Sequence, residues 1–295
     1  IKSSLKNKCE SLLISNDYRR FNYVPYAYRT KDYGKTWTRI VDASDVKSYT
    51  LSIIEDPENP NLIFLGTDDG LYLSFDAGTK WLKWTEGFPT VSTKDLAIHP
   101  REHDLVIGTF GRAAWVLDDI RPLRELARST AKLKKEVSLF DSPDAYLAAY
   151  QQGSGSRFGG DALYNAENRK RGAMITYYLK EGKKDMEKMT STSDKNAEDI
   201  ASKKDDDKDL SGVQKKDSLQ FDFYDGSRLI RSLKYKTPDK KGFHRIYWGL
   251  DEKGPDRPAR KISKQKTEPE GATVKPGTYK ERFHLAKLSI QPWSP

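Results

Sequence analysis

The sequence predicts an all-β protein in two parts, an incomplete β-propeller followed by a β-sandwich. An octet containing Asp, Gly and Trp occurs twice, 44 residues apart, and short apolar segments separated by turn residues surround it. After residue 172, most of the apolar segments alternate apolar with polar residues, as strands with one buried face do. The first two observations predict the propeller, and the third predicts the sandwich.

The repeated octets are TKDYGKTW, Thr30 to Trp37, and SFDAGTKW, Ser74 to Trp81. A second echo overlaps them, because the stretch from Asp56 to Asp76 recurs as His99 to Asp119. The unit is therefore about 43 residues long, which is the length of a four-stranded propeller blade. Within one unit, strands are expected at 49–54, 61–67, 70–75 and 80–85.

Each octet has the composition of a tight turn. Its Asp side chain is expected to accept hydrogen bonds from nearby backbone N–H groups, and its Gly to adopt a positive φ that a Cβ disfavours. Its Trp then begins the next strand and packs within the blade. We therefore assign both copies to turn construction rather than chemistry: Thr30, Asp32, Gly34, Trp37, Ser74, Asp76, Gly78 and Trp81.

The octets resemble Asp-boxes, also called BNR repeats, which occur in sialidases, sortilin-type receptors and related propellers. The stretch from Pro25 to about Leu126 is similar to the end of the propeller in large bacterial proteins labelled glycosyl hydrolase-like or sortilin-like. This resemblance implies an architecture rather than an activity, since many functions share it. It also implies a place outside the cytoplasm, in the periplasm, at the cell surface or secreted.

Residues 1–125 hold too few blades to close a ring. We expect the last strands of one blade, one full blade and three strands of another, without a third Asp-box. Each blade of a propeller packs between two neighbours. We therefore expect the remaining blades to be partners of this chain, supplied by the same polypeptide or by a neighbouring chain, and the chain itself to be part of a longer product.

The second half is expected to contain an extended linker at 126–172 and a β-sandwich at 173–295. The expected strands are 173–180, 218–225, 228–235, 242–251 and 277–290. The highly charged stretch at about 181–217 has almost no large apolar residue, so we expect a disordered insertion there. These segments resemble the immunoglobulin-like module of flagellar hook-cap proteins and of many bacterial surface proteins.

Composition narrows the possible partners. Lys and Arg number 52 against 43 Asp and Glu, a net charge of +9, and both signs are interleaved. This excess would suit an anionic partner, but the interleaving favours a basic solubilising surface, without specific nucleic-acid binding. Cys9 is the only cysteine, which excludes an intrachain disulfide. The sequence contains no run of 18 apolar residues, so it predicts no membrane-spanning helix.

Candidate sites for chemistry are few. The string HPREH at 99–103 matches a zinc-peptidase motif, but that motif needs a helix, whereas Pro100 and the repeat place this string in a turn. Asp95, Arg112 and Asp118 lie near expected strand ends and are the candidate ligand-facing residues. We assign no catalytic residue, no metal and no cofactor.

Two functions remain open. The first is an extracytoplasmic scaffold or binding protein that presents a propeller face to a protein, peptide or glycan. The alternative is a sialidase-like glycoside hydrolase whose catalytic groups lie mainly on blades absent from this chain. The first is preferred, because no acid and base pair is evident in the sequence.

Overall fold

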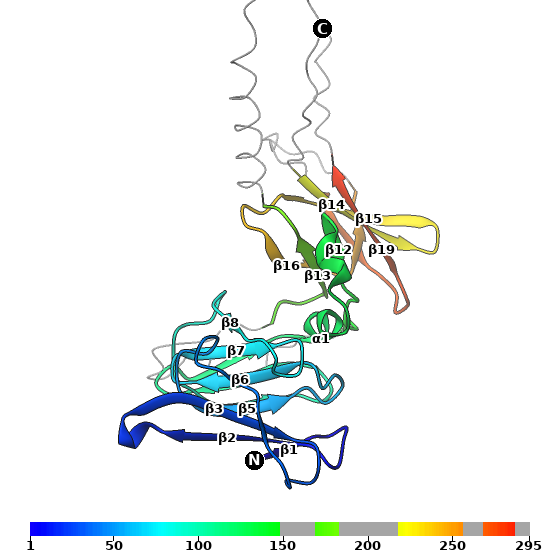
Figure 1. Ribbon diagram of the computed structural model, residues 1–295. Helices are drawn as coiled ribbons and strands as arrows, with labels where there is room; N and C mark the ends of the chain where they lie inside the picture. Colours follow the sequence, from blue (N-terminus) through cyan, green and yellow to red (C-terminus); the bar gives the residue numbers. More distant parts are fainter. Residues whose placement is uncertain (148–168, 183–217, 256–267, 287–295) are drawn as a thin grey trace, which may run out of the picture. The chain divides into compact units, whose positions relative to one another are not determined.

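A computed structural model describes residues 1–147, 169–182, 218–255 and 268–286 (Figure 1). Strands make up nearly all of its elements, which confirms the all-β prediction of a partial propeller and a sandwich. The chain divides into two compact units, residues 1–134 and 135–295. None of the helices in the described ranges is long and apolar enough to cross a membrane.

The first unit contains three antiparallel sheets, each running up and down in chain order. The first sheet contains β1 (Lys2–Ser3), β2 (Ser11–Asp17), β3 (Asn22–Thr30) and β4 (Thr38–Arg39), with a 3-10 turn, Tyr18–Arg20, between β2 and β3. The second contains β5 (Thr50–Glu55), β6 (Ile63–Thr67), β7 (Gly70–Ser74) and β8 (Leu82–Trp84). The third contains β9 (Thr93–Ile98), β10 (Leu105–Thr109) and β11 (Ala114–Leu117).

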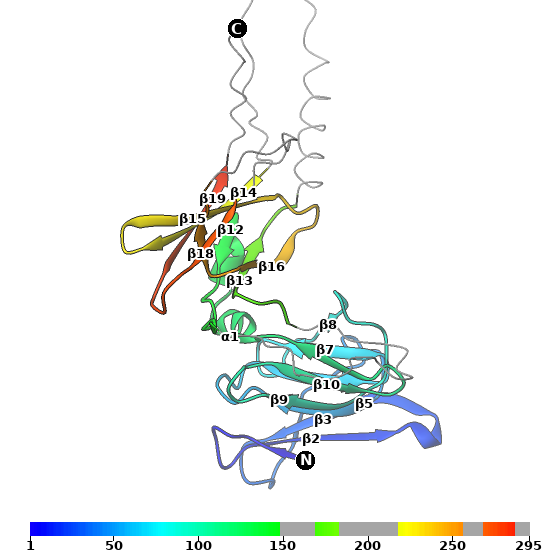
Figure 2. The ribbon, with the colours of Figure 1, turned by 180° about the vertical axis from the view of Figure 1, so that it is seen from behind.

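The second sheet lies between the other two, because β5 packs against β2 on one side and β9 on the other (Figures 1 and 2). Every residue of β6 and β7 is buried. Alternate side chains of a strand point to opposite faces, so Ile63 and Leu65 enter the core shared with the first sheet. Phe64 enters the core shared with the third sheet. This two-sided burial is what a blade inside a propeller requires.

An α-helix follows the third sheet and belongs to the first unit. Helix α1 (Arg121–Arg128) has Pro122 in its first turn and precedes a 3-10 turn, Thr130–Lys134. Leu123 and Ala127 pack against the core between the second and third sheets. This packing explains why the first unit extends to residue 134 rather than ending at 125.

The second unit is a β-sandwich. One sheet contains β12 (Val137–Leu139), β13 (Ala173–Leu179) and β16 (Gly242–Trp248), and the other contains β15 (Arg228–Lys236), β14 (Ser218–Asp225) and β19 (Lys280–Ala286). A two-stranded sheet contains β17 (Asp251–Lys253) and β18 (Glu270–Thr273). Both larger sheets contribute side chains to one shared core.

The expected linker and the expected charged insertion differ in how much of them the structure describes. The expected linker 126–172 contains β12, which is a strand because its backbone pairs with β13 from Val137↔Leu179 to Leu139↔Tyr177. Most of the expected charged insertion, 183–217, lies outside the described residues. The immunoglobulin-like assignment stays a prediction.

Candidate functional site

The two octets form nearly identical turns. The Oγ1 of Thr30 donates to Asp32 at 2.8 Å and accepts the N–H of Gly34 at 2.9 Å. The Oγ of Ser74 does the same with Asp76 and Gly78, at 2.8 and 2.9 Å. Each Asp carboxylate in turn accepts the backbone N–H four residues later at 2.9 Å.

The backbone of each turn is tied to the preceding hairpin of its own sheet. Tyr33 and Ala77, which precede the two glycines, also have positive φ, 60° and 59°, and this was not anticipated. The N–H of Tyr33 donates to the carbonyl of Cys9, and that of Ala77 to the carbonyl of Asn61. The assignment of these octets to turn construction stays a prediction.

Asp32 shows the electrostatic result of this geometry. The hydrogen bond from the Thr36 hydroxyl is the largest cause that lowers the pKa of Asp32 to about 2, followed by the Thr36 N–H and the Thr30 hydroxyl. Three donors directed at one carboxylate favour its charged form. The Asp32 carboxylate therefore serves as the hydrogen-bond acceptor of the turn.

The tryptophans of the two octets differ in their surroundings. Trp81 is 6% exposed, and its indole N–H donates to the carbonyl of Ile40, which follows β4 in the first sheet. Trp37 occupies the same octet position in the first sheet and is 37% exposed. Trp81, the turn tryptophan of the second sheet, thus packs against the preceding sheet and is hydrogen-bonded to it.

The three candidate ligand-facing residues are not brought together. Asp95 lies on β9 opposite Gly108, and Arg112 lies in the turn between β10 and β11, so both are at one end of the third sheet. Asp118 directly follows β11, at the opposite end of that sheet. At roughly 3.3 Å per residue, β11 places Asp118 about 10 Å or more from that turn.

The outer face of the third sheet exposes a row of apolar side chains. Val106 on β10 pairs with Ala97 on β9 and with Val116 on β11, so the three side chains share one face. Val106 is 37% and Val116 56% exposed, whereas the opposite face packs into the core with Leu96 and Ile107. This row is called the outer row below.

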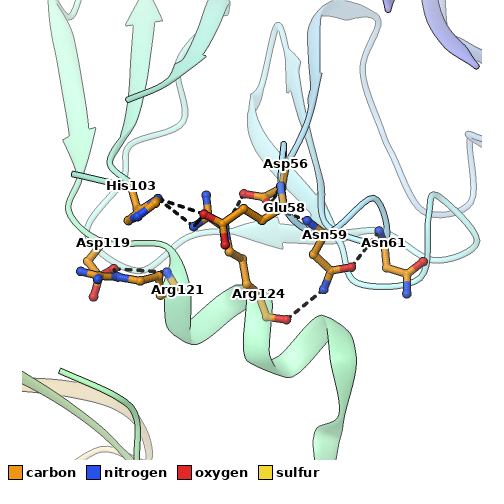
Figure 3. A network of polar contacts seen from close by, with 8 residues as sticks. All are labelled: Asp56, Glu58, Asn59, Asn61, His103, Asp119, Arg121 and Arg124. Atoms are coloured by element: carbon orange, nitrogen blue, oxygen red, sulfur yellow. Dashed lines mark hydrogen bonds and ion pairs between the residues drawn. The ribbon is translucent and has the colours of Figure 1, made fainter. Parts of the chain in front are cut away.

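A buried polar network attaches α1 to the turns of the second and third sheets (Figure 3). Arg124 on α1 is 2% exposed, and its Nε donates to Asp56 at 2.7 Å. Its Nη1 lies 3.0 Å from Glu58 Oε1 and 2.8 Å from His103 Nδ1. The Asn59 side chain donates to the carbonyl of Arg124 at 2.9 Å.

Sequence reasoning missed this network. The only signal was the repeat itself, since Asp56 and His99 open equivalent turns of the second and third sheets. The string HPREH, residues 99–103, lies in a turn, as the repeat indicated. The imidazoles of its two histidines have different partners. The Nδ1 of His99 accepts the N–H of Glu102, while that of His103 meets Arg124.

The second unit contains a cavity of about 440 Å³. Residues of the 141–147 segment, the 275–279 turn and the sandwich line it, among them Trp248, Tyr279 and Glu281. Burial is the largest cause that raises the pKa of the Glu281 carboxyl, and the neighbouring Asp141 raises it further. Nothing in the sequence had drawn attention to this cavity.

Comparisons with known proteins place the chain in a family. No curated protein matches it. Among solved structures it is similar to the crystal structure of the Niastella koreensis GH74 enzyme, with 19% identity and a TM-score of 0.35 over 40% of this chain. The matched region spans only 20% of that enzyme. A family model described as sortilin, neurotensin receptor 3 (Sortilin-Vps10) matches residues 26–247, about three quarters of the chain. The chain therefore belongs to the sortilin–Vps10 family.

Proposed function

We propose that this chain is part of an extracytoplasmic scaffold or binding protein that presents a propeller face to a protein, peptide or glycan. The outer row carries the proposal, because aligned apolar side chains on three strands are suited to packing against another sheet. Further blades, from the same polypeptide or a neighbouring chain, cover this face. Membership of the sortilin–Vps10 family supports an extracellular or lumenal location.

The exposed Trp37 supports the same proposal at the other side of the unit. Trp81 is buried by the sheet that precedes its own, and Trp37 is 37% exposed at the matching octet position. A blade that precedes the first sheet would cover Trp37 in the same way. The three sheets are thus an arc of a larger ring.

Binding is favoured over hydrolysis by the placement of the candidate residues. Most glycosidases use two carboxyl groups that flank one scissile bond, whereas sialidases use a tyrosine nucleophile. Asp95 and Asp118 lie at opposite ends of the third sheet, so they do not form such a pair. Arg112 is exposed near Asp95 and is suited to contacting an anionic group of a ligand.

A ligand screen tests the binding role. The full-length protein is applied to glycan and peptide arrays and is assayed in parallel with sialosides and aryl glycosides. We expect saturable binding, weakened by Arg112→Ala, without turnover. Turnover that disappears in Asp95→Asn or Asp118→Asn would instead establish the glycoside hydrolase alternative.

Thiol labelling tests the larger ring. In a background of the full-length protein from which Cys9 and every other cysteine have been removed, Val116→Cys should react slowly with a maleimide until urea unfolds the protein. Phe110→Cys is the control, because Phe110 is 73% exposed in the turn after β10, away from the outer row. Equally fast labelling of both cysteines in the native protein would show that nothing covers the outer row.

A further inference from the structure

The cavity of the second unit has an aromatic wall. Phe223 on β14 and Trp248 on β16 stack with ring centroids 4.4 Å apart, and Tyr279 meets Trp248 edge-on at 5.5 Å. All three residues line the cavity, whose volume of about 440 Å³ lies within the range of ligand pockets. Phe223 and Trp248 are 2% and 3% exposed, and Tyr279 is the most exposed of the three, so it offers the ring surface that an alkyl stem or a cation can contact.

Acidic side chains also line the cavity, and Glu281 lies beside the aromatic residues because it pairs directly with Phe223 between β14 and β19. Glu281 on β19 is partly buried, and its carboxylate accepts a hydrogen bond from the Ser142 hydroxyl at 3.2 Å. Asp141 and Asp144 also line the cavity. In the described part of the chain, the hydroxyl of Ser142 is the hydrogen-bond partner of the Glu281 carboxylate.

Among the described residues that line the cavity, three are acidic, Asp141, Asp144 and Glu281, and one is basic, Lys275. The charges of the lining are therefore only partly balanced. The causes that shift the pKa of Glu281 are burial, Ser142 and Asp141, and no cation is among them. Burial and the neighbouring Asp141 both disfavour the charged form of Glu281, and a bound cation would favour it.

We propose that this cavity binds the basic side chain of a peptide, a lysine or arginine. The ammonium or guanidinium group pairs with Glu281 and Asp141, and the alkyl stem lies against Trp248 and Tyr279. A neutral sugar would also stack on the aromatic wall, but it would leave the carboxylates unbalanced. The proposal concerns the second unit and does not depend on the function proposed for the propeller arc.

Isothermal titration at pH 7 tests the proposal with three capped tripeptides, acetyl-Gly-X-Gly-amide, in which X is lysine, arginine or norleucine. Norleucine keeps the alkyl stem and removes the charge. We expect saturable binding of the lysine or arginine peptide, at least about tenfold tighter than that of the norleucine peptide.

Variants distinguish the cavity from general charge attraction. Glu281→Gln and Asp141→Asn should each weaken binding about tenfold, while Glu270→Gln, an exposed change on β18 outside the cavity, should have no effect. Asp141 is exposed, so its variant tests the acidic lining without altering a partly buried side chain. Absence of binding by both basic peptides, equal binding of the norleucine peptide, or unchanged affinity in both cavity variants would overturn the proposal.

Discussion

The indole N–H of Trp81 donates a 2.7 Å hydrogen bond to the backbone carbonyl of Ile40, so an Asp-box turn of one sheet closes on the sheet before it. The same two residues lie in one hydrophobic core. The octet therefore acts beyond its own hairpin and connects neighbouring blades. The stability that is lost when either turn is changed therefore depends on whether a neighbouring sheet packs against that turn.

Replacing each turn tryptophan by phenylalanine should lower the free energy of unfolding by different amounts, because the two tryptophans have different environments. Trp81→Phe removes the donor to the Ile40 carbonyl and should lower the free energy of unfolding by about 1–2 kcal/mol. Trp37→Phe changes a partly exposed ring and should cost less than about 0.5 kcal/mol in this chain. Urea unfolding followed by circular dichroism measures both, and equal losses would contradict the closing role of Trp81.

Substitution of the turn glycine should also lower stability more in the second octet than in the first. Gly34 and Gly78 have φ of 83° and 94°, so an added Cβ strains both. At Gly78 the Cβ would also meet the Ile40 side chain at 3.0 Å, whereas at Gly34 its nearest neighbour is the Trp37 ring at 3.8 Å. Gly78→Ala should therefore lower the melting temperature more than Gly34→Ala does. The reverse order in a thermal melt would contradict this explanation.

The buried Arg124 to Asp56 pair should be essential for docking α1. Arg124→Met leaves the Asp56 carboxylate buried without its guanidinium and should cost about 3–5 kcal/mol. Arg128→Met, an exposed change on the same helix, should cost less than about 0.5 kcal/mol. Urea unfolding of the two variants measures the difference, and a small effect at Arg124 would mean that apolar packing alone holds α1.

The titration of Asp32 should report on the turn hydrogen bonds. The folded pKa of Asp32 is about 2, below its ordinary value of 3.8, so the ionised turn contributes stability that is lost as the pH falls from about 4 to 2. Thr36→Val removes the hydroxyl donor and should move the NMR-detected pKa upward, toward 3.8. Thr79→Val, in the second octet, should leave the titration of Asp32 unchanged.

Glu281 should make the second unit less stable near neutral pH than in mild acid. Burial raises its folded pKa above 4.5, so the protonated form stabilises the fold at low pH, and this stability is lost as the pH rises through the folded pKa. Glu281→Gln mimics the neutral form and should raise the melting temperature at pH 7 but not at pH 4. Glu270→Gln should change neither, and a gain that is equal at both pH values would exclude ionisation as its cause.

Local patterns were enough to predict much of the fold. The hydroxyl, Asp and Gly of each octet interact within a few residues of one another, and the apolar segments of the blade and the sandwich are read directly along the chain. The octet pattern did not reveal the positive φ of Tyr33 and Ala77, because neither residue type favours that conformation. The strand β12 was missed because three residues, Val137–Leu139, are too short a segment to show a period.

Local residue patterns were sufficient to locate the turns and strands, because backbone preference and side-chain alternation act over a few neighbouring residues. Tertiary packing brings Trp81 to Ile40 and Arg124 to Asp56, and it places Glu281 in a cavity lined by aromatic residues. The partners of the first two pairs are 41 and 68 residues apart in the chain. Their proximity is the result of how whole sheets pack, which no local pattern encodes.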